Sequence, residues 1–156
     1  MFTKIKLTVL IGYIAFFSNN MFSFEISVDQ KNIRQAIEKG VKFLYQNQNA
    51  TGWWTDSELP ALTGLALVAL KMSDVSSLDA KYESERRRAY DYLVSLAKSD
   101  GSIHDGRLIN YNTACSLMAF SVSNDERYRA LIEKARAYIA GSQIDLGDSG
   151  KQDNPN

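Results

Sequence analysis

The stretch KGVKFLYQNQNATGWW at residues 39–54 decides the fold, because its pattern of residue types occurs three times in the chain. A basic residue precedes a small one; an aromatic and an aliphatic residue follow, then a glutamine or alanine, and last a glycine. The aligned positions are Lys39, Arg88 and Lys134; Gly40, Ala89 and Ala135; Phe43, Tyr92 and Tyr138; Leu44, Leu93 and Ile139; Gln48, Ala97 and Gln143; and Gly52, Gly101 and Gly147. Such a recurrence indicates stacked repeat units.

Each copy begins in a segment with the pattern of an amphipathic helix. Apolar residues such as Ile37, Val41 and Leu44 recur at helical spacing, with charged residues between them. Residues 88–97 and 128–139 repeat this spacing. We therefore expect three outer helices, each bound to its neighbours along one apolar face.

Two further segments are apolar on nearly every side, ALTGLALVAL at 61–70 and TACSLMAF at 113–120, and they align at an offset of fifty residues. A helix of this composition must be surrounded by other elements, so we expect two inner helices enclosed by the outer ones. The expected capping residues are Ser57 or Glu58 for the first inner helix, and Asn110 or Asn112 for the second.

The order of these segments predicts an all-α protein built from helical hairpins. An outer helix, a glycine turn and an inner helix occur twice, and a third outer helix follows, which makes about two and a half repeats within residues 24–156. The glycine permits the left-handed conformation that ends a helix, and Trp54 is expected to pack back over the helix end. In the second copy Ile103 stands where the first has this tryptophan.

The spacing K-G-x-x-F-L-x-x-x-Q-x-x-x-G-x-W in residues 39–54 resembles the QW repeat of squalene-hopene cyclases and related terpene cyclases, and more loosely the repeats of protein prenyltransferase β subunits. The resemblance implies an α/α toroid, a ring of helical hairpins around an apolar cavity. The motif residues that it identifies as structural are Lys39, Gly40, Phe43, Leu44, Gln48, Gly52, Trp54, Gly101, Gln143 and Gly147.

The resemblance also implies more hairpins than this sequence holds. A polar stretch occupies the place where a third inner helix would begin. We expect the chain to be the N-terminal part of a longer toroid, and the alternative is a short solenoid that covers its open end by self-association.

The N-terminus has the pattern of an export signal. Lys4 and Lys6 precede the apolar run LTVLIGYIAFF at 7–17, which suits a signal-peptide core and is too short for a membrane span. We expect residues 1–23 to be a signal peptide that is removed, and the mature protein to be periplasmic or extracellular, without a transmembrane span.

Charge and cysteine content exclude several classes of function. Eighteen basic residues balance eighteen acidic ones, so the chain lacks the positive charge of a nucleic-acid-binding protein. Cys115 is the single cysteine, which excludes an internal disulfide and a zinc–thiolate cluster. Its apolar neighbours predict a buried, packed thiol.

Catalytic motifs of the resembled families are missing from the sequence. Cyclases of this kind protonate an alkene with a D-x-D-D motif, which does not occur here. Prenyltransferase β subunits hold zinc with Asp, Cys and His, and no matching context surrounds the cysteine and histidine of this chain, so we expect no metal and no cofactor. The remaining candidates precede or begin the inner helices, whose N-termini share one rim of such a ring; they are Asp56, Glu58, His104, Asp105 and Tyr111.

Three functions remain open on the sequence. The first is an exported toroid, similar to a terpene cyclase or prenyltransferase, whose apolar cavity takes an isoprenoid or another lipid-like small molecule and whose catalytic residues lie outside this segment. The second is a non-catalytic binding or scaffold module outside the cytoplasm. The third is a polysaccharide lyase or glycosidase, in which Trp53 would stack on a sugar beside Asp56.

Overall fold

The computed structural model describes residues 29–75, 78 and 80–143. The chain divides into two compact units, 1–33 and 34–156. Of the first unit, residues 29–33 are described, and there the Asp29 carboxylate accepts a hydrogen bond from the Lys31 backbone N–H as α2 begins. The signal peptide expected at 1–23 lies outside the described residues. The described residues from 34 onward, including most of α2, belong to the second unit.

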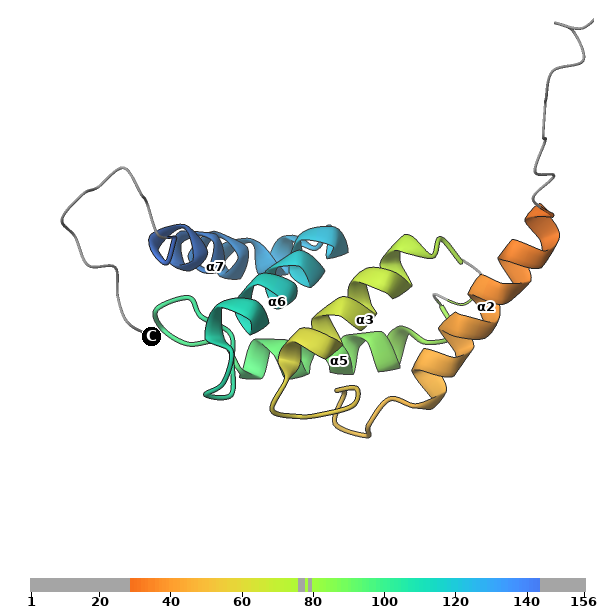
Figure 1. Ribbon diagram of the computed structural model, residues 1–156, viewed down its shortest axis with the longest axis horizontal. Coiled ribbons are helices and arrows are strands. Elements are labelled where there is room, and N and C mark those ends of the chain that lie inside the picture. The colour runs from red at the N-terminus through yellow and green to blue at the C-terminus, as the bar shows by residue number, and fades with distance from the viewer. Residues whose placement is uncertain (1–28, 76–77, 79, 144–156) are drawn as a thin grey trace, which may run out of the picture. The chain divides into compact units, whose positions relative to one another are not determined.

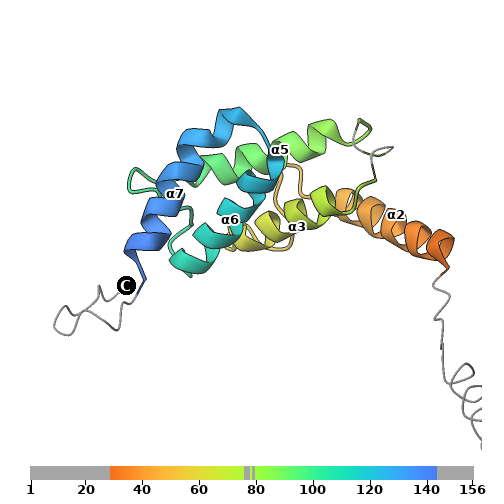
Figure 2. The ribbon, with the colours of Figure 1, turned by 90° about the horizontal axis from the view of Figure 1, so that it is seen from above.

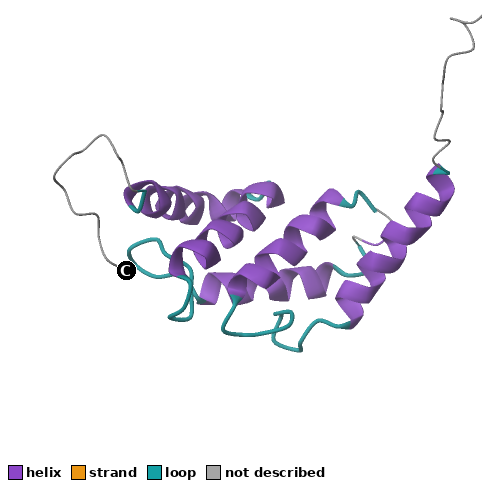
Figure 3. Cartoon of the chain, in the orientation of Figure 1, coloured by secondary structure: helices purple, strands orange, loops and turns teal. Residues whose placement is uncertain are grey.

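Five α-helices and one 3-10 turn make up the described part of the chain (Figures 1 and 3). They are α2 (Gln30–Gln46), α3 (Pro60–Met72), α5 (Glu83–Ser95), α6 (Ile109–Ser123), η1 (Glu126–Tyr128) and α7 (Arg129–Gly141). The described residues contain no strand, only one isolated bridge between Ala97 and Ile103. The all-α prediction is confirmed, and each helix lies where the periodicity placed it.

The two inner helices, α3 and α6, lie side by side, with α5 packed against α3 and α7 against α6 (Figures 1 and 2). Gly64 of α3 faces the backbone of Cys115, and a Cβ at Gly64 would lie 2.6 Å from the Cys115 carbonyl oxygen. The missing side chain therefore lets the helices approach closely. Leu67 and Phe120 fill the seam beside this contact and are almost fully buried.

The repeated turn is held by the residues of the QW-like motif. The Trp54 indole N–H donates to the carbonyl oxygen of Leu44 over 2.7 Å, which fixes the ring over the end of α2. Gln48 Nε2 donates to the Gly52 carbonyl over 2.8 Å and to the Glu85 carbonyl of α5 over 2.9 Å. One side chain therefore closes its own turn and joins it to the next repeat.

The second turn replaces these polar contacts with packing. Ile103 is fully buried where Trp54 stands in the first copy. In both copies an inner-helix threonine accepts from the backbone N–H of this residue: Thr63 Oγ1 accepts from Trp54 over 3.2 Å, and Thr113 Oγ1 from Ile103 over 2.9 Å. The threonines are fully buried, so the aligned pair fastens each turn to its inner helix.

The capping predictions for the inner helices are wrong. Leu59 and Leu108 occupy the N-cap positions, and neither helix has a side-chain cap bond from its own N-cap residue. Instead, buried Asn112 of α6 accepts from the Ala61 N–H of α3 over 3.1 Å, and its amide nitrogen donates to the Arg107 carbonyl over 2.7 Å. A neighbouring helix thus supplies the cap, because the two N-termini lie together.

The expectation that the inner helices are fully enclosed is also wrong. Leu65 of α3 is 39% exposed and Met118 of α6 is 49% exposed. The surfaces of α3 and α6 that face away from each other and from the outer helices have no cover among the described residues. Leu65 and Met118 are therefore apolar side chains that the described part of the chain leaves open to contact with another molecule.

Candidate functional site

The candidate site is an apolar groove between the end of α2, the first turn and the outward surface of α3. Its volume is about 540 Å³, within the range of small-molecule sites. The lining residues are Phe43, Leu44, Asn47, Trp54, Thr55, Leu62, Leu65, Ala66 and Ala69. Seven of these nine residues are apolar, so the groove suits a ligand that is itself largely apolar.

The walls of the groove differ in how firmly they are held. Trp54 is 5% exposed and is fixed by its indole hydrogen bond to Leu44. Phe43, in contrast, is 63% exposed. The Asn47 amide nitrogen donates to the Phe43 carbonyl over 2.8 Å, so one of the two polar groups in the groove already has a partner. The Trp54 ring is thus held in place, while the Phe43 ring is largely exposed to solvent. Contact with these two rings can bind an apolar chain through buried surface area alone.

A charged rim forms where the segments before α3 and α6 meet. Arg107 lies 2.6 Å from a Glu58 carboxylate oxygen and 3.7 Å from one of Asp56. The Tyr92 hydroxyl of α5 donates to the Ser57 carbonyl over 2.7 Å. The rim is continuous with the groove along the chain, because Thr55 in the groove directly precedes Asp56.

Burial of the Tyr92 ring, together with the smaller effect of the nearby carboxylates of Asp105 and Asp56, raises the pKa of its hydroxyl to about 12. Tyr92 therefore stays protonated at neutral pH and acts as a hydrogen-bond donor. The ion pairs of Arg107 with Glu58 and Asp56 show that residues from the two turns come together at the rim. The rim carboxylates are exposed, however, and Arg107 neutralises part of their charge.

The other sequence candidates do not assemble into a catalytic group. His104 Nδ1 accepts a hydrogen bond from the Gly106 backbone N–H over 2.8 Å. In a His–Asp pair this nitrogen would instead donate to the aspartate, so here a local turn uses it. Tyr111 is 48% exposed and lies one turn before Cys115 on α6. Burial raises the pKa of Cys115 and keeps it a thiol, and Cys115 is buried as predicted.

The remaining residues named from the sequence have structural positions or lie outside the described part. Trp53 is half-buried and is not among the residues of the groove. Lys39 and Gly40 are exposed on α2, and Gln143 is exposed after α7. Gly147 lies outside the described residues.

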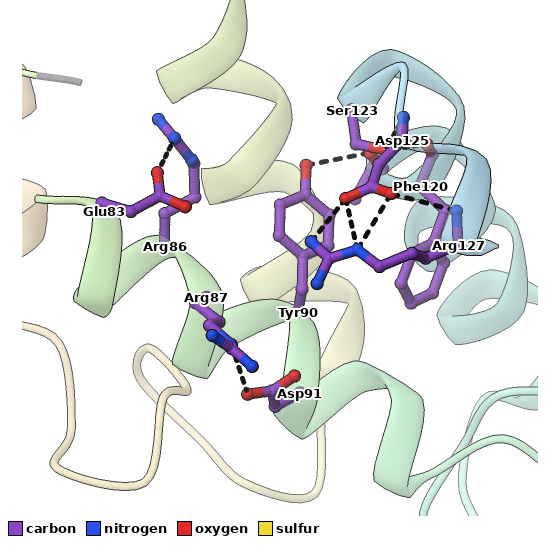
Figure 4. A network of polar contacts seen from close by, with 10 residues as sticks. Glu83, Arg86, Arg87, Tyr90, Asp91, Phe120, Ser123, Asp125 and Arg127 are labelled. Carbon is purple, nitrogen blue, oxygen red and sulfur yellow. Dashed lines mark hydrogen bonds and ion pairs between the residues drawn. The ribbon is translucent and has the colours of Figure 1, made fainter. Parts of the chain in front are cut away.

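Sequence reasoning missed a second, smaller cavity of about 180 Å³ between the C-terminal ends of α2 and α3, the first turns of α5 and residues 123–128. Its lining includes Tyr45, Lys71, Arg87, Tyr90, Arg127 and Tyr128. Figure 4 shows Tyr90 between two ion pairs, Glu83 with Arg86 and Asp125 with Arg127.

Hydrogen bonds from Arg127 lower the pKa of Asp125. Burial raises the pKa of Tyr90 to about 12, and its hydroxyl donates to the Ala119 carbonyl over 3.1 Å. The i,i+4 spacing of Arg86 and Tyr90 was visible in the sequence. The packing of η1 beside these two residues, which brings Asp125 and Arg127 to the same cavity, could not be read from the sequence.

Among residues 29–75, 78 and 80–143, no three His, Cys, Asp or Glu side chains gather closely enough to hold a metal ion. No helix in this part of the chain is both long and apolar enough to cross a membrane. No protein-family model matches the chain, and comparison with curated proteins and with solved structures finds no significant match either.

Proposed function

We propose that the chain is an exported repeat module of the terpene-cyclase and prenyltransferase kind, part of an α/α toroid, and that it holds an isoprenoid or another lipid-like molecule against its inner helices. The observation that carries the proposal is the apolar groove on α3. Its volume of about 540 Å³ and its mostly apolar lining suit a branched hydrocarbon chain. The QW-like turn supports the proposal, because its hydrogen bond from the Trp54 indole to Leu44 holds the Trp54 ring in place as one wall of the groove.

The rim next to this groove suits the polar end of such a ligand. Arg107, Glu58 and the Tyr92 hydroxyl offer charged and hydrogen-bonding groups beside the turn that contains Thr55. A ligand with an apolar chain and a hydroxyl head would keep its head in this wet, polar region and its chain on α3. The geometry therefore favours an isoprenoid alcohol over an unfunctionalised hydrocarbon.

The experiment is a titration of the chain with geranylgeraniol, followed through the fluorescence of Trp54 and Trp53. Leu65→Glu places a carboxylate in the groove, where the apolar ligand would have to desolvate it. Val94→Glu is the matched control, because Val94 is 41% exposed against 39% for Leu65 and lies on α5. We expect saturable binding by the wild type and the control, and binding at least about tenfold weaker by Leu65→Glu.

Equal binding by Leu65→Glu and Val94→Glu, or no saturable signal from the wild type, would refute the proposal. Circular dichroism of each variant checks that the helices persist. Because Leu65 is more than one third exposed already, the substitution is expected to leave the fold intact.

A second candidate, binding without catalysis, is favoured by the state of the rim carboxylates. Alkene protonation requires a carboxylic acid held in apolar surroundings, where its pKa rises. Asp56 and Glu58 are instead about half exposed and paired with Arg107. Recovery of geranylgeraniol unchanged after long incubation, measured by gas chromatography, would support this candidate; a cyclised or dehydrated product would contradict it.

A further inference from the structure

The cavity of about 180 Å³ that contains Tyr90 is lined by more basic than acidic side chains. Its acidic residues are Glu83 and Asp125. Its four basic residues lie on three different elements: Lys71 in the last turn of α3, Arg86 and Arg87 on α5, and Arg127 in η1. Figure 4 shows the three arginine side chains around the Tyr90 ring. The lining therefore has an excess of positive charge.

The two acidic residues are already paired with two of the arginines. Arg86 forms an ion pair with Glu83, and Arg127 forms one with Asp125. Arg127 uses its Nε and Nη2 atoms for Asp125. Because a guanidinium group carries N–H donors on three nitrogens, Nη1 of Arg127 is still available to a ligand. The two ion pairs thus neutralise the acidic side chains without using every donor.

The excess charge belongs to Lys71 and Arg87. Lys71 is exposed at the end of α3 and forms no ion pair with a described residue. Arg87 lies 3.9 Å from the carboxylate of Asp91, which does not line the cavity, and both of these side chains are about two-thirds exposed. An exposed ion pair of this kind contributes little. An anion in the cavity therefore meets one cation without a counter-ion and one that is only weakly paired.

Tyr128 adds a hydroxyl donor to the same cavity. Its ring stacks on that of Tyr90 with the centroids 5.3 Å apart and lies 4.8 Å from the ring of Phe120, which holds the side chain in place. Its hydroxyl has no hydrogen-bond acceptor among the described residues, whereas the Tyr90 hydroxyl donates to the Ala119 carbonyl. Burial raises the pKa of Tyr128, so its hydroxyl keeps the proton at neutral pH and can donate a hydrogen bond to an anion.

The size of the cavity restricts the ligand to a small ion or to the charged end of a larger molecule. A volume of about 180 Å³ is below the range of sites that enclose a whole drug-sized ligand. The lining also includes Leu67 and Leu70, which are almost fully buried. Charges beside buried apolar groups interact more strongly than charges in bulk water, so the cavity favours a compact ion of high charge.

We propose that this cavity binds a phosphate group, either the free ion or the monoester end of a larger molecule, through Lys71, Arg87 and the Tyr128 hydroxyl. A phosphate group at neutral pH carries a charge of about −1.5 to −2, which matches both excess cations, whereas a carboxylate would neutralise one of them. Guanidinium groups bind phosphate oxygens in pairs, and lysine binds them as a point charge. The cavity shares no lining residue with the α3 groove, so the proposal is independent of any ligand there.

Isothermal titration calorimetry of the chain with sodium phosphate at neutral pH tests this site, with sodium chloride of equal ionic strength as the comparison. We expect saturable binding of one phosphate per chain and no saturable binding of chloride. A titration with glycerol 3-phosphate distinguishes the two sources of the group. Binding at least as tight as that of phosphate indicates the monoester end of a larger molecule, and weaker binding indicates the free ion.

Two double variants with the same change in net charge separate this site from general attraction. Lys71→Gln with Arg87→Gln removes the two excess cations of the cavity. Lys42→Gln with Arg136→Gln is the matched control, because these residues are also exposed on helices and do not line the cavity. We expect phosphate binding to be at least about tenfold weaker in the first variant and within about twofold of the wild type in the control.

Tyr128→Phe keeps the ring and removes the hydroxyl, so we expect it to weaken phosphate binding by about threefold or more. Circular dichroism of each variant checks that the helices persist. Absence of saturable binding of both phosphate and glycerol 3-phosphate by the wild type, chloride binding as strong as phosphate binding, or equal weakening in the two double variants would overturn the proposal. Unchanged binding by Tyr128→Phe would overturn the role of its hydroxyl.

Discussion

Substituting Gly64 by alanine should separate α3 from α6, and the cost can be worked from the contact between them. The new Cβ would lie 2.6 Å from the Cys115 carbonyl oxygen and 2.8 Å from its carbon, against the 3.4 Å at which ordinary contact begins. Both atoms belong to the backbone of α6, so the helices must move apart by most of an ångström. Overpacking of this kind costs about 1–3 kcal/mol.

Alanine also has an intrinsic advantage over glycine in a helix, about 1 kcal/mol. We therefore expect Gly64→Ala to lower the free energy of unfolding by a net amount of up to about 2 kcal/mol. Gly40→Ala on α2 meets nothing within 4 Å and should raise it by about 0.5–1 kcal/mol. The same substitution is thus expected to change the free energy of unfolding in opposite directions at two helical glycines.

Urea unfolding followed by circular dichroism at low protein concentration measures both variants, and the slope of each curve checks that the unfolded states are comparable. In thermal unfolding, each kcal/mol should shift Tm by about 4 °C. A Gly64→Ala protein that is stabilised as much as Gly40→Ala would refute the reasoning, because the interface would then have room for a methyl group that the structure does not show.

Three further predictions rest on other contacts. Asn112→Ala leaves the Ala61 N–H and the Arg107 carbonyl without their partner and should lower the free energy of unfolding by about 2–4 kcal/mol. The exposed Asn110→Ala control should change it by less than about 0.5 kcal/mol. Equal effects of the two substitutions in chemical denaturation would contradict the cap that Asn112 provides for α3. Gln48→Ala removes both bonds of the first turn and should cost about 1–2 kcal/mol, against little for exposed Gln46→Ala, with hydrogen exchange of the Gly52 turn as the local readout. Because burial raises the pKa of Tyr90 from 10.0 to about 12, the unfolded chain loses the hydroxyl proton at a lower pH than the folded chain. The free energy of unfolding should therefore decrease as the pH rises from about 10 to about 12, and it should decrease less steeply in Tyr90→Phe. Identical pH profiles of the two proteins would count against burial of this hydroxyl.

The candidate site was predictable from the sequence only in part. Repeat alignment placed Asp56 and Asp105 in equivalent turns, and the charges of both raise the pKa of Tyr92. Arg107 as the partner of Asp56 and Glu58 could not be foreseen, because an ion pair between two turns depends on how far one repeat is rotated against the next. The groove was not predictable either, since composition made α3 apolar on all sides without showing which side would be uncovered.

The sequence by itself determined the helices, their order and their turns. Helical periodicity is a local property, and the recurring glycines and aromatic–aliphatic pairs mark where each repeat bends, so residues 39–54 were enough to identify the unit. Only the tertiary structure decided how the units meet. The cap from Asn112 to α3, the close approach at Gly64 and the seating of Gly52 on Arg88 all join residues far apart in the chain. Their geometry depends on the spacing and rotation of packed helices, which side-chain volumes at the interface set together and which no single segment encodes.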